Sequence, residues 1–192
     1  MRRWLAILIA LVLVAATAVA IFIAKDSKKN TDKKSTASNV SSQDKSKAVS
    51  VKTACKIFTL SDAKKLLGDT AKGGQSSVTT SSNDVDVSTC TYTEDSGNNA
   101  PVSTHQSATL LARIGRTPKG IASNQSQFGP LKPAGAQDVS GYGDMAFWDV
   151  EHGQLNILKN NNWYILSNGP ITPADRTLDE AKQLADILIN KV

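Results

Sequence analysis

The chain has 192 residues, of which 22 are Lys or Arg and 17 are Asp or Glu, giving a formal net charge of +5. This length suits one domain with appendages. Residues 1–52 contain ten basic and three acidic residues, a net +7, whereas residues 53–192 contain twelve and fourteen, a net −2. A nucleic-acid-binding domain carries its positive charge on the folded surface, so this division argues against nucleic acid as a partner.

The first element is an apolar segment. Residues 4–24 form a run of 21 residues that only Thr17 interrupts, and Arg2 and Arg3 precede it. A helix of this length rises about 30 Å, the thickness of the hydrocarbon core, so we expect a membrane anchor. The alternative is a cleaved signal peptide, because residues 16–20 contain the small-x-small pattern of cleavage sites. The apolar part of such a peptide is usually about 7–15 residues long, which favours the anchor, and whether cleavage occurs stays open.

The segment after the anchor predicts a flexible tether. Residues 25–53 contain ten Ser or Thr, eight Lys and no aromatic residue. Such a segment cannot bury enough apolar surface to offset the entropy lost on ordering, and its ends should lie about 30 Å apart. Its lysines argue for the cytoplasmic side of a membrane, as do Arg2 and Arg3 at the other end of the apolar run. We resolve this conflict with the cysteines, which suit an oxidising compartment, and expect the domain to be extracytoplasmic.

Cys55 and Cys90 are the only cysteines of the chain. Two thiols in an exported domain usually pair, and this disulfide would stabilise the fold by roughly 3–4 kcal/mol on the chain-entropy model. The alternatives are two free thiols or a redox pair, although the C-x-x-C spacing of redox pairs is absent. Two cysteines and two distant histidines lack the spacing of metal ligands, so we expect neither a metal nor another cofactor.

The first half of the domain predicts a helix and a hairpin. Thr59 and Asp62 have the spacing of a capping box, and Gly68 ends the short helix that follows. Residues 86–93 and 102–114 read as strands separated by turn formers. The second strand alternates, with one apolar face and one mostly polar face: Val102, Ala108, Leu110, Ala112 and Ile114 against Ser103, His105, Ser107, Thr109 and Arg113.

The second half predicts a helix, a meander and a final helix. Thr117 and Pro118 indicate the start of a helix that would hold Ile121, Gln125 and Phe128 on one side. A loop at residues 129–135 follows. Three short apolar strands then form a meander, and an amphipathic helix begins near Thr177 with Glu180 in a capping pattern. The strands of that meander are residues 146–150, 155–159 and 163–167.

These elements predict an α+β fold. We expect a mostly antiparallel sheet covered by the long C-terminal helix and one or two short helices, preceded by a single N-terminal transmembrane helix. The chain would comprise an anchor at residues 1–24, a disordered linker at residues 25–53 and an extracytoplasmic domain at residues 54–192.

Four short motifs carry a resemblance to a known group of proteins. They are residues 55–68 (CKIFTLSDAKKLLG), residues 88–92 (STCTY), residues 141–146 (GYGDMA) and the last amphipathic helix. In this order they resemble small cell-envelope lipoproteins and sensor-like domains of unknown function from actinobacteria and similar bacteria. The resemblance implies export, a Cys–Cys bridge and an α+β fold, and it supplies no catalytic residues. This chain departs from that group by having an apolar anchor where many members have a lipidated cysteine.

The two histidines are the candidate catalytic residues. His105, beside Ser103 and Ser107, could act as a general base, but no acid is positioned to orient it, and an exposed histidine is the simpler interpretation. His152 lies beside Glu151 in an expected hairpin turn and has no evident partners for a metal or an acid–base role.

Five aromatic residues crowd into the meander region and could line a ligand cavity between sheet and helix, although a packed core is the ordinary interpretation. They are Tyr142, Phe147, Trp148, Trp163 and Tyr164. We therefore expect a membrane-anchored, extracytoplasmic envelope protein, a non-enzymatic binding or sensor-like module. Its partners would be the membrane, through residues 4–24, and an envelope protein, wall polymer or lipid. The alternatives are a carrier of a hydrophobic ligand and a hydrolase that uses His105 or His152.

Overall fold

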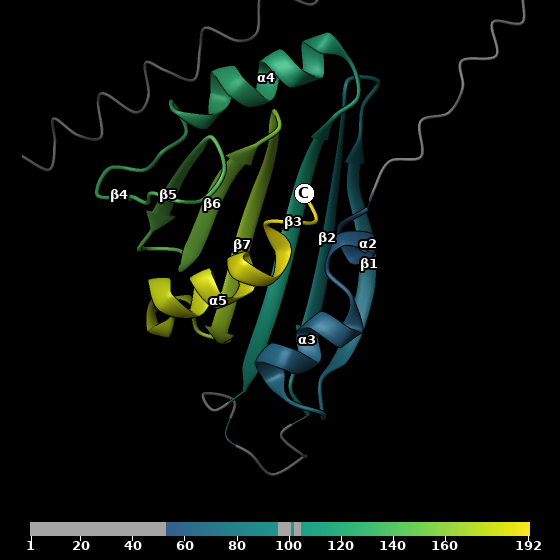
Figure 1. The fold of residues 1–192 in the computed structure, drawn as a ribbon, viewed down its shortest axis with the longest axis vertical. Helices are drawn as coiled ribbons and strands as arrows, with labels where there is room; N and C mark the ends of the chain where they lie inside the picture. Colours follow the sequence, from purple (N-terminus) through teal and green to yellow (C-terminus); the bar gives the residue numbers. More distant parts are fainter. Residues whose placement is uncertain (1–52, 96–100, 102–104) are drawn as a thin grey trace, which may run out of the picture. The chain divides into compact units, whose positions relative to one another are not determined.

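The computed structural model describes residues 53–95, residue 101 and residues 105–192 (Figure 1). The predicted anchor and all of the predicted linker except Thr53 lie outside these residues. Within the described part of the chain, no helix is both long and apolar enough to cross a membrane.

The described residues form one antiparallel sheet with helices around it, in the order β1-β2-β3-β7-β6-β5-β4. The strands are β1 (Lys72–Ser81), β2 (Val85–Thr93), β3 (Gln106–Gly115), β4 (Gln137–Asp138), β5 (Met145–Asp149), β6 (Gln154–Lys159) and β7 (Asn162–Pro170). The helices are α2 (Ala54–Ile57), α3 (Leu60–Leu67), α4 (Pro118–Phe128), α5 (Leu178–Leu188) and the 3-10 helix η2 (Pro173–Asp175). The predicted α+β class with an antiparallel sheet is confirmed.

The sheet consists of two three-stranded meanders and the short edge strand β4, which pairs with β5. Strands β1, β2 and β3 form the first, and β5, β6 and β7 form the second. They join where β3 runs antiparallel to β7, from the pair Gln106–Pro170 to the pair Arg113–Trp163. Helix α4 lies between the meanders in the chain, so the connection between them crosses over the end of the sheet (Figure 1).

Both predicted capping boxes are present. In α3 the backbone N–H of Thr59 donates to Asp62 Oδ2 at 3.0 Å, and in α5 the N–H of Thr177 donates to Glu180 Oε2 at 2.8 Å. Each reciprocal pair satisfies backbone groups that the first turn of a helix leaves unbonded. The threonine and the acid three residues later therefore predicted these two helix starts correctly.

Strand β1 was not predicted from the sequence. Its ladder with β2 shifts register between Gly73 and Gln75 and again between Val78 and Thr80, so two bulges break the alternation. Both Gly73 and Gly74 have positive φ, a conformation that glycine adopts without steric cost. A Ser/Thr/Gly segment interrupted by two bulges lacks the alternation of apolar and polar residues that predicts a strand.

Helix α4 forms as predicted, but of the three residues expected on one side only Phe128 is buried. The structure buries Gly120, Asn124 and Phe128, while Gln125 is exposed. A Cβ atom on Gly120 would lie 1.9 Å from the carbonyl oxygen of Asp84, so the helix backbone sits directly on the β1–β2 turn. This close approach leaves no room for a large apolar side chain, and a glycine and an asparagine face inward instead.

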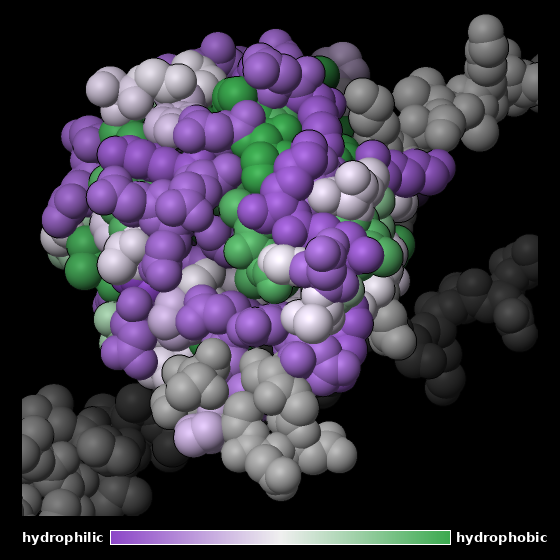
Figure 2. Space-filling view, turned by 60° about the horizontal axis from the view of Figure 1, so that its bottom comes forward, coloured by the Kyte–Doolittle hydropathy of each residue, from purple (hydrophilic) through white to green (hydrophobic). Residues whose placement is uncertain are grey.

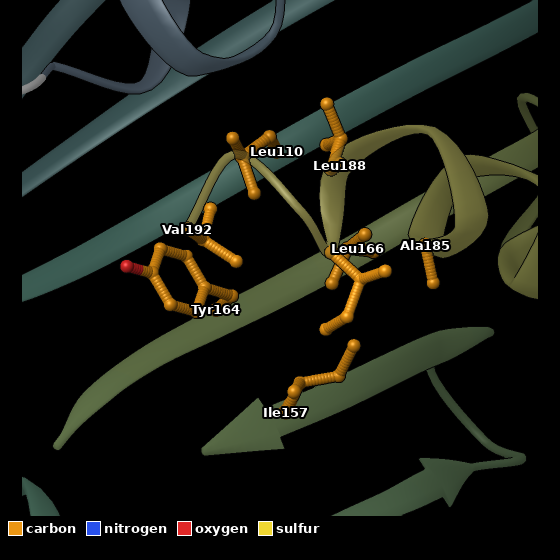
Figure 3. Close-up of a pocket in the computed structure, with 8 residues that line it drawn as sticks. Leu110, Ile157, Tyr164, Leu166, Ala185, Leu188 and Val192 are labelled. Carbon is orange, nitrogen blue, oxygen red and sulfur yellow. The ribbon is translucent and has the colours of Figure 1, made fainter. Parts of the chain in front are cut away.

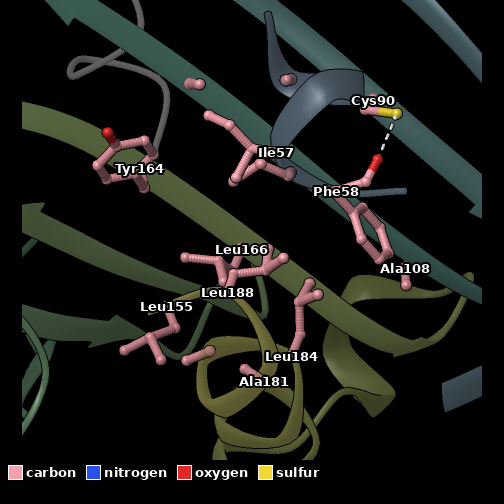
Figure 4. Close-up of a cluster of buried hydrophobic side chains, with 14 of the residues drawn as sticks. Ile57, Phe58, Cys90, Ala108, Leu155, Tyr164, Leu166, Ala181, Leu184 and Leu188 are labelled. Carbon is pink, nitrogen blue, oxygen red and sulfur yellow. Dashed lines mark hydrogen bonds between the residues drawn. The ribbon is translucent and has the colours of Figure 1, made fainter. Parts of the chain in front are cut away.

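The main core lies between the sheet and helices α2, α3 and α5, on what we call the helix face (Figures 1 and 4). Leucines of β3, β6, β7 and α5 meet there, and Phe58 packs edge-to-face on Tyr92 with ring centroids 4.9 Å apart. Each fully buried side chain of this size contributes about 1.5–3 kcal/mol. The fully buried leucines are Leu110, Leu155, Leu166, Leu184 and Leu188.

A smaller aromatic cluster lies on the opposite side of the sheet, which we call the α4 face. Phe128 of α4 contacts Phe147, Leu158 and Trp163 there. Its ring centroid is 5.1 Å from that of Phe147 and 5.3 Å from that of Trp163. This cluster holds α4 against β5, β6 and β7.

The predicted disulfide is present and joins Cys55 of α2 to Cys90 of β2, with the two Cα atoms 5.0 Å apart. Cys90 is fully buried, and its sulfur lies 3.6 Å from the carbonyl oxygen of Phe58 (Figure 4). The backbone N–H of Ala54 donates to Ser88 Oγ at 2.8 Å, beside the bridge. The chain therefore enters the fold pinned to the middle of β2.

Candidate binding sites on the α4 face

The five aromatic residues predicted to line one cavity lie on both sides of the sheet. Trp148 and Tyr164 belong to the core of the helix face, and Tyr142 packs against that core. Phe147 and Trp163 belong to the cluster on the α4 face. Phe147 and Trp148 are consecutive in one strand, as are Trp163 and Tyr164, and consecutive strand residues point to opposite faces. The described residues thus contain no cavity that all five could line.

The cavity on the helix face is a packing gap (Figure 3). Its volume is about 10 Å³, enough for one water molecule at most. Figure 3 shows side chains from the sheet and from α5 converging on it. They are Leu110, Ile157, Tyr164, Leu166, Ala185, Leu188, Ile189 and Val192. This face is therefore a core, and Tyr164 is one of its members.

Tyr142 ties the loop before β5 to the last helix. Its hydroxyl donates to Asp186 Oδ1 at 2.9 Å. Burial, reinforced by this bond to a carboxylate, raises the pKa of Tyr142 to about 12. The phenol therefore stays protonated at neutral pH and keeps its role as a donor.

His152 has an oriented ring, which the sequence did not establish. Its Nδ1 lies 2.8 Å from Oδ2 of the buried Asp149, whose Oδ1 accepts the backbone N–H groups of Glu151 and His152 at 3.1 and 3.2 Å. A carboxylate that holds one ring nitrogen is typical of a histidine that acts through the other. Across the described ranges, no hydroxyl or thiol is bonded to His152, and no three His, Cys, Asp or Glu residues are grouped to hold a metal.

His105 precedes β3, next to residues 102–104, which lie outside the description. Its Nε2 is buried and has no hydrogen-bond partner among the residues described. Its backbone carbonyl accepts the N–H of Ile171 at 3.1 Å, which continues the β3–β7 ladder. Of its two expected partners, Ser103 lies outside the described residues, and Ser107 is buried in β3 and forms no hydrogen bond with Nε2 of His105.

Two open grooves flank α4. The first, of about 330 Å³, lies at the start of the helix, and the second, of about 430 Å³, lies at its end. The first is lined by Ser82, Asp84, Val85, Val87, Arg113, Lys119 and Ser123, and we call it the Arg113 groove. The second is lined by Phe128, Gly129, Lys132, Asp138, Val139, Ser140, Met145, Ala146 and Phe147, and we call it the Met145 groove.

Local sequence builds one wall of the Arg113 groove by fixing the start of α4. Thr117 Oγ1 accepts the N–H of Gly120 at 3.2 Å and donates to Asp84 Oδ1 at 2.7 Å. The hydrogen bond from Thr117 and the nearby ammonium of Lys119 hold the pKa of Asp84 below its usual range. Because Gly120 lacks a side chain, the helix can also rest on the Asp84 carbonyl.

Arg113 is held in place by neutral partners. Its Nη1 donates to Gln127 Oε1 at 2.9 Å, its Nη2 donates to Ser123 Oγ at 3.1 Å, and its Cζ lies 6.0 Å from the ring centroid of Trp163. Burial lowers the pKa of its guanidinium, which nevertheless stays charged. Sequence reasoning placed Arg113 on the polar side of its strand without singling it out, although it is the one charged residue of β3.

The Met145 groove is more apolar. Phe128 and Phe147 form its floor, and an ion pair of 2.6 Å between Lys132 and Asp138 lies at its rim. Met145 is 47% exposed there, so its flexible side chain is free to contact a ligand. The sequence indicated this region through the short motif at residues 141–146 and through Phe147, one of the five aromatic residues expected at a cavity.

The surface in Figure 2, where the bottom of the view in Figure 1 is turned forward, is mostly hydrophilic, with a hydrophobic band near its centre and smaller hydrophobic patches around it. The large apolar side chains that the described residues leave exposed are separated along the chain: Leu60, Val78, Leu131, Met145, Val150 and Ile171. Scattered exposed side chains of this kind are normal in soluble domains.

Comparison of the chain with protein-family models, with curated proteins and with solved structures gives no match. The resemblance to actinobacterial-type envelope domains thus stays a prediction from the four motifs.

Proposed function

We propose that this protein is a membrane-anchored, extracytoplasmic binding module whose ligand site lies on the α4 face. One observation carries the proposal: the α4 face has two open grooves of about 330 and 430 Å³, whereas the gap in the core of the helix face is about 10 Å³. Ligand sites are concave and commonly exceed about 300 Å³, so the two grooves have a suitable size and the gap in the core does not.

The proposed location rests on the sequence and on the disulfide. The apolar run at residues 4–24 is long enough to span a bilayer. The Cys55–Cys90 bridge suits the oxidising side of a membrane. A reporter fused after Lys52 should accordingly be active outside the cytoplasm, and activity only in the cytoplasm would contradict the proposed orientation.

The binding function is tested with the full-length protein in a nonionic detergent, mixed with an envelope extract of the source cells and measured by native mass spectrometry. We expect a retained lipid, glycan or other small-molecule mass. Met145→Glu would place a charge in the Met145 groove, and Ser123→Tyr would fill the Arg113 groove. One of these variants should lose the retained mass.

The matched control is Val150→Glu, which places the same charge on an exposed apolar position of the β5–β6 turn, outside both groove linings. It should retain the mass. The absence of any retained mass, or retention by both groove variants, would contradict a ligand site on the α4 face.

A second candidate function is hydrolysis, and the Asp149–His152 pair favours it. The buried carboxylate orients the ring, which is 59% exposed, as a general base requires. In this function the nucleophile is a water molecule, from which His152 would take a proton as the water attacks the ester or amide carbonyl. His152→Ala should then abolish hydrolysis of a panel of ester and amide substrates, and a variant that keeps wild-type hydrolysis would exclude it.

A further inference from the structure

We propose that the Arg113 groove binds the oxyanion of a small ligand, a carboxylate or a phosphate, through the guanidinium of Arg113. This inference rests on the proposed binding function and names the ligand chemistry of one of its two grooves. It depends on charge, on the fixed position of the guanidinium and on the shape of the groove.

The neighbouring basic residues are paired with acids, whereas the positive charge of Arg113 is not compensated. Arg116 pairs with Asp86 at 3.4 Å, and Lys119 pairs with Asp84 at 3.3 Å. Within the part of the chain that the structure describes, Arg113 forms no ion pair. The groove therefore carries one positive charge that no neighbouring carboxylate neutralises.

The guanidinium is held before any ligand arrives. The face of Trp163 lies against it, and Ser123 and Gln127, one turn apart on α4, each accept one of its hydrogen bonds. These two bonds use two of its five N–H groups, which leaves donors for a ligand. A planar donor fork is well suited to two oxygens of a carboxylate or phosphate, and an already ordered side chain loses less entropy on binding.

Partial burial strengthens this interaction. The Arg113 residue is half-buried, and this burial lowers the pKa of its guanidinium. A charge–charge contact in such surroundings is stronger than one in bulk water. A more exposed arginine, such as Arg116, would gain less from the same anion.

The other groove walls indicate the size and polarity of the ligand. Val85 and Val87 provide an apolar side, and Ser82 and Ser123 provide hydroxyl groups. A volume of about 330 Å³ is at the small end of ligand sites. A compact molecule with one anionic group and a small apolar body matches these walls.

The test uses the full-length protein in nonionic detergent at constant ionic strength, with inorganic phosphate, phenyl phosphate and benzoate as probes. Binding is measured by calorimetry and by tryptophan fluorescence, because Trp163 lies against the guanidinium. We expect phenyl phosphate or benzoate to bind. Whichever probe binds with the higher affinity identifies the phosphate or the carboxylate as the preferred oxyanion. Arg113→Gln should weaken that binding by about tenfold or more, the scale of one lost charged hydrogen-bonding partner.

The matched control is Arg116→Gln, which removes the same charge three residues away and outside the groove. It should change binding by less than about twofold, as expected for an exposed charge. Equal weakening by both substitutions would indicate general attraction to a positive surface and overturn the proposal. The absence of binding by all three probes would overturn it as well.

A second variant keeps the test decisive if Arg113→Gln disturbs α4. Val87→Trp leaves Arg113 in place but fills the groove, and it should also abolish binding, whereas unchanged affinity would contradict a site in this groove. The proposed function has a separate outcome. If no probe binds but the envelope extract still yields a mass that Met145→Glu removes, the binding function stands and the oxyanion site is wrong.

Discussion

The two meanders of the sheet reach stability by different means. In β1–β3, the residues that face the helices are mostly small, among them Ser88, Cys90, Ala108 and Ala112. In β5–β7, the corresponding core residues are mostly large, with Ala146 as the exception: Trp148, Leu155, Ile157, Tyr164 and Leu166. The disulfide belongs to the first meander. Small side chains let α2 approach closely but bury little apolar surface, so the covalent bond compensates where hydrophobic burial is weakest.

The largest expected effect tests the second meander, where burial should dominate. Trp148→Ala removes a large buried side chain from the core of the helix face. We expect the free energy of unfolding to fall by about 3–5 kcal/mol, because both the burial and the packing around it are lost. Urea unfolding of the variant measures this, and a loss below about 1 kcal/mol would remove the contrast between the meanders.

The disulfide tests the first meander. A Cys55→Ala/Cys90→Ala double variant should lose about 3–4 kcal/mol on the chain-entropy model. Amide hydrogen exchange should rise more in β1 and β2 than in β6, because the bridge lies in the first meander. Uniform acceleration across both meanders would show that the bridge stabilises the whole domain equally.

Acidic pH should weaken the contact between α3 and the C-terminal end of the chain, where Asp62 pairs with Lys191. Burial acts to raise the pKa of Asp62, but hydrogen bonds from Lys191 and Thr59 outweigh it and hold the pKa below its usual range. A carboxylate whose pKa is lowered by folding stabilises the fold above its unfolded pKa, near 4, and this contribution is lost as the pH falls through the folded value.

The measurement is urea unfolding between pH 6 and pH 2. Wild-type stability should fall below about pH 4, and Asp62→Asn should be less stable near neutral pH and lose less over the same range. Identical pH profiles of the two proteins would show that Asp62 does not contribute to this dependence.

The smallest effects are expected from the N-caps of two helices, Thr59 of α3 and Thr177 of α5. Thr59→Ala and Thr177→Ala each remove a threonine that bonds the acid three residues later. Each should cost about 1 kcal/mol, a typical value for an N-cap. The Thr59 variant should cost more, because its acid, Asp62, is buried whereas Glu180 is not. A larger loss in the Thr177 variant would contradict this ranking.

Elements with a clear period could be predicted from the sequence. Strand β3 alternates, α5 repeats its leucines at helical spacing, and Thr59 and Thr177 marked two helix starts. Strand β1 could not be predicted, because its bulges interrupt the pattern. The inner side of α4 could not be predicted either. Gly120 faces inward because the helix backbone contacts the backbone of Asp84, and a pattern of hydrophobic residues does not predict such a contact.

The candidate site was less predictable than the fold. Proximity in the sequence grouped Phe147 with Trp148, yet a strand sends consecutive side chains to opposite faces. The Arg113 groove depends on residues from the β1–β2 turn, β3 and α4, which only the tertiary structure brings together. A lone charge in an otherwise uncharged strand was the one available signal, and it points to Arg113.

The position of the bridge also determines how the domain bears mechanical load. In an anchored chain, tension arriving at Thr53 would reach Cys55 two residues later and pass through the covalent bond into Cys90. The single turn of α2, closed by a few backbone hydrogen bonds, is thereby relieved of that force. Strand β2 receives it instead and is hydrogen-bonded along its length to β1 on one side and β3 on the other. Separating β2 by pulling would require many of these bonds to shear together, so a force applied at Thr53 would act on a strong part of the sheet.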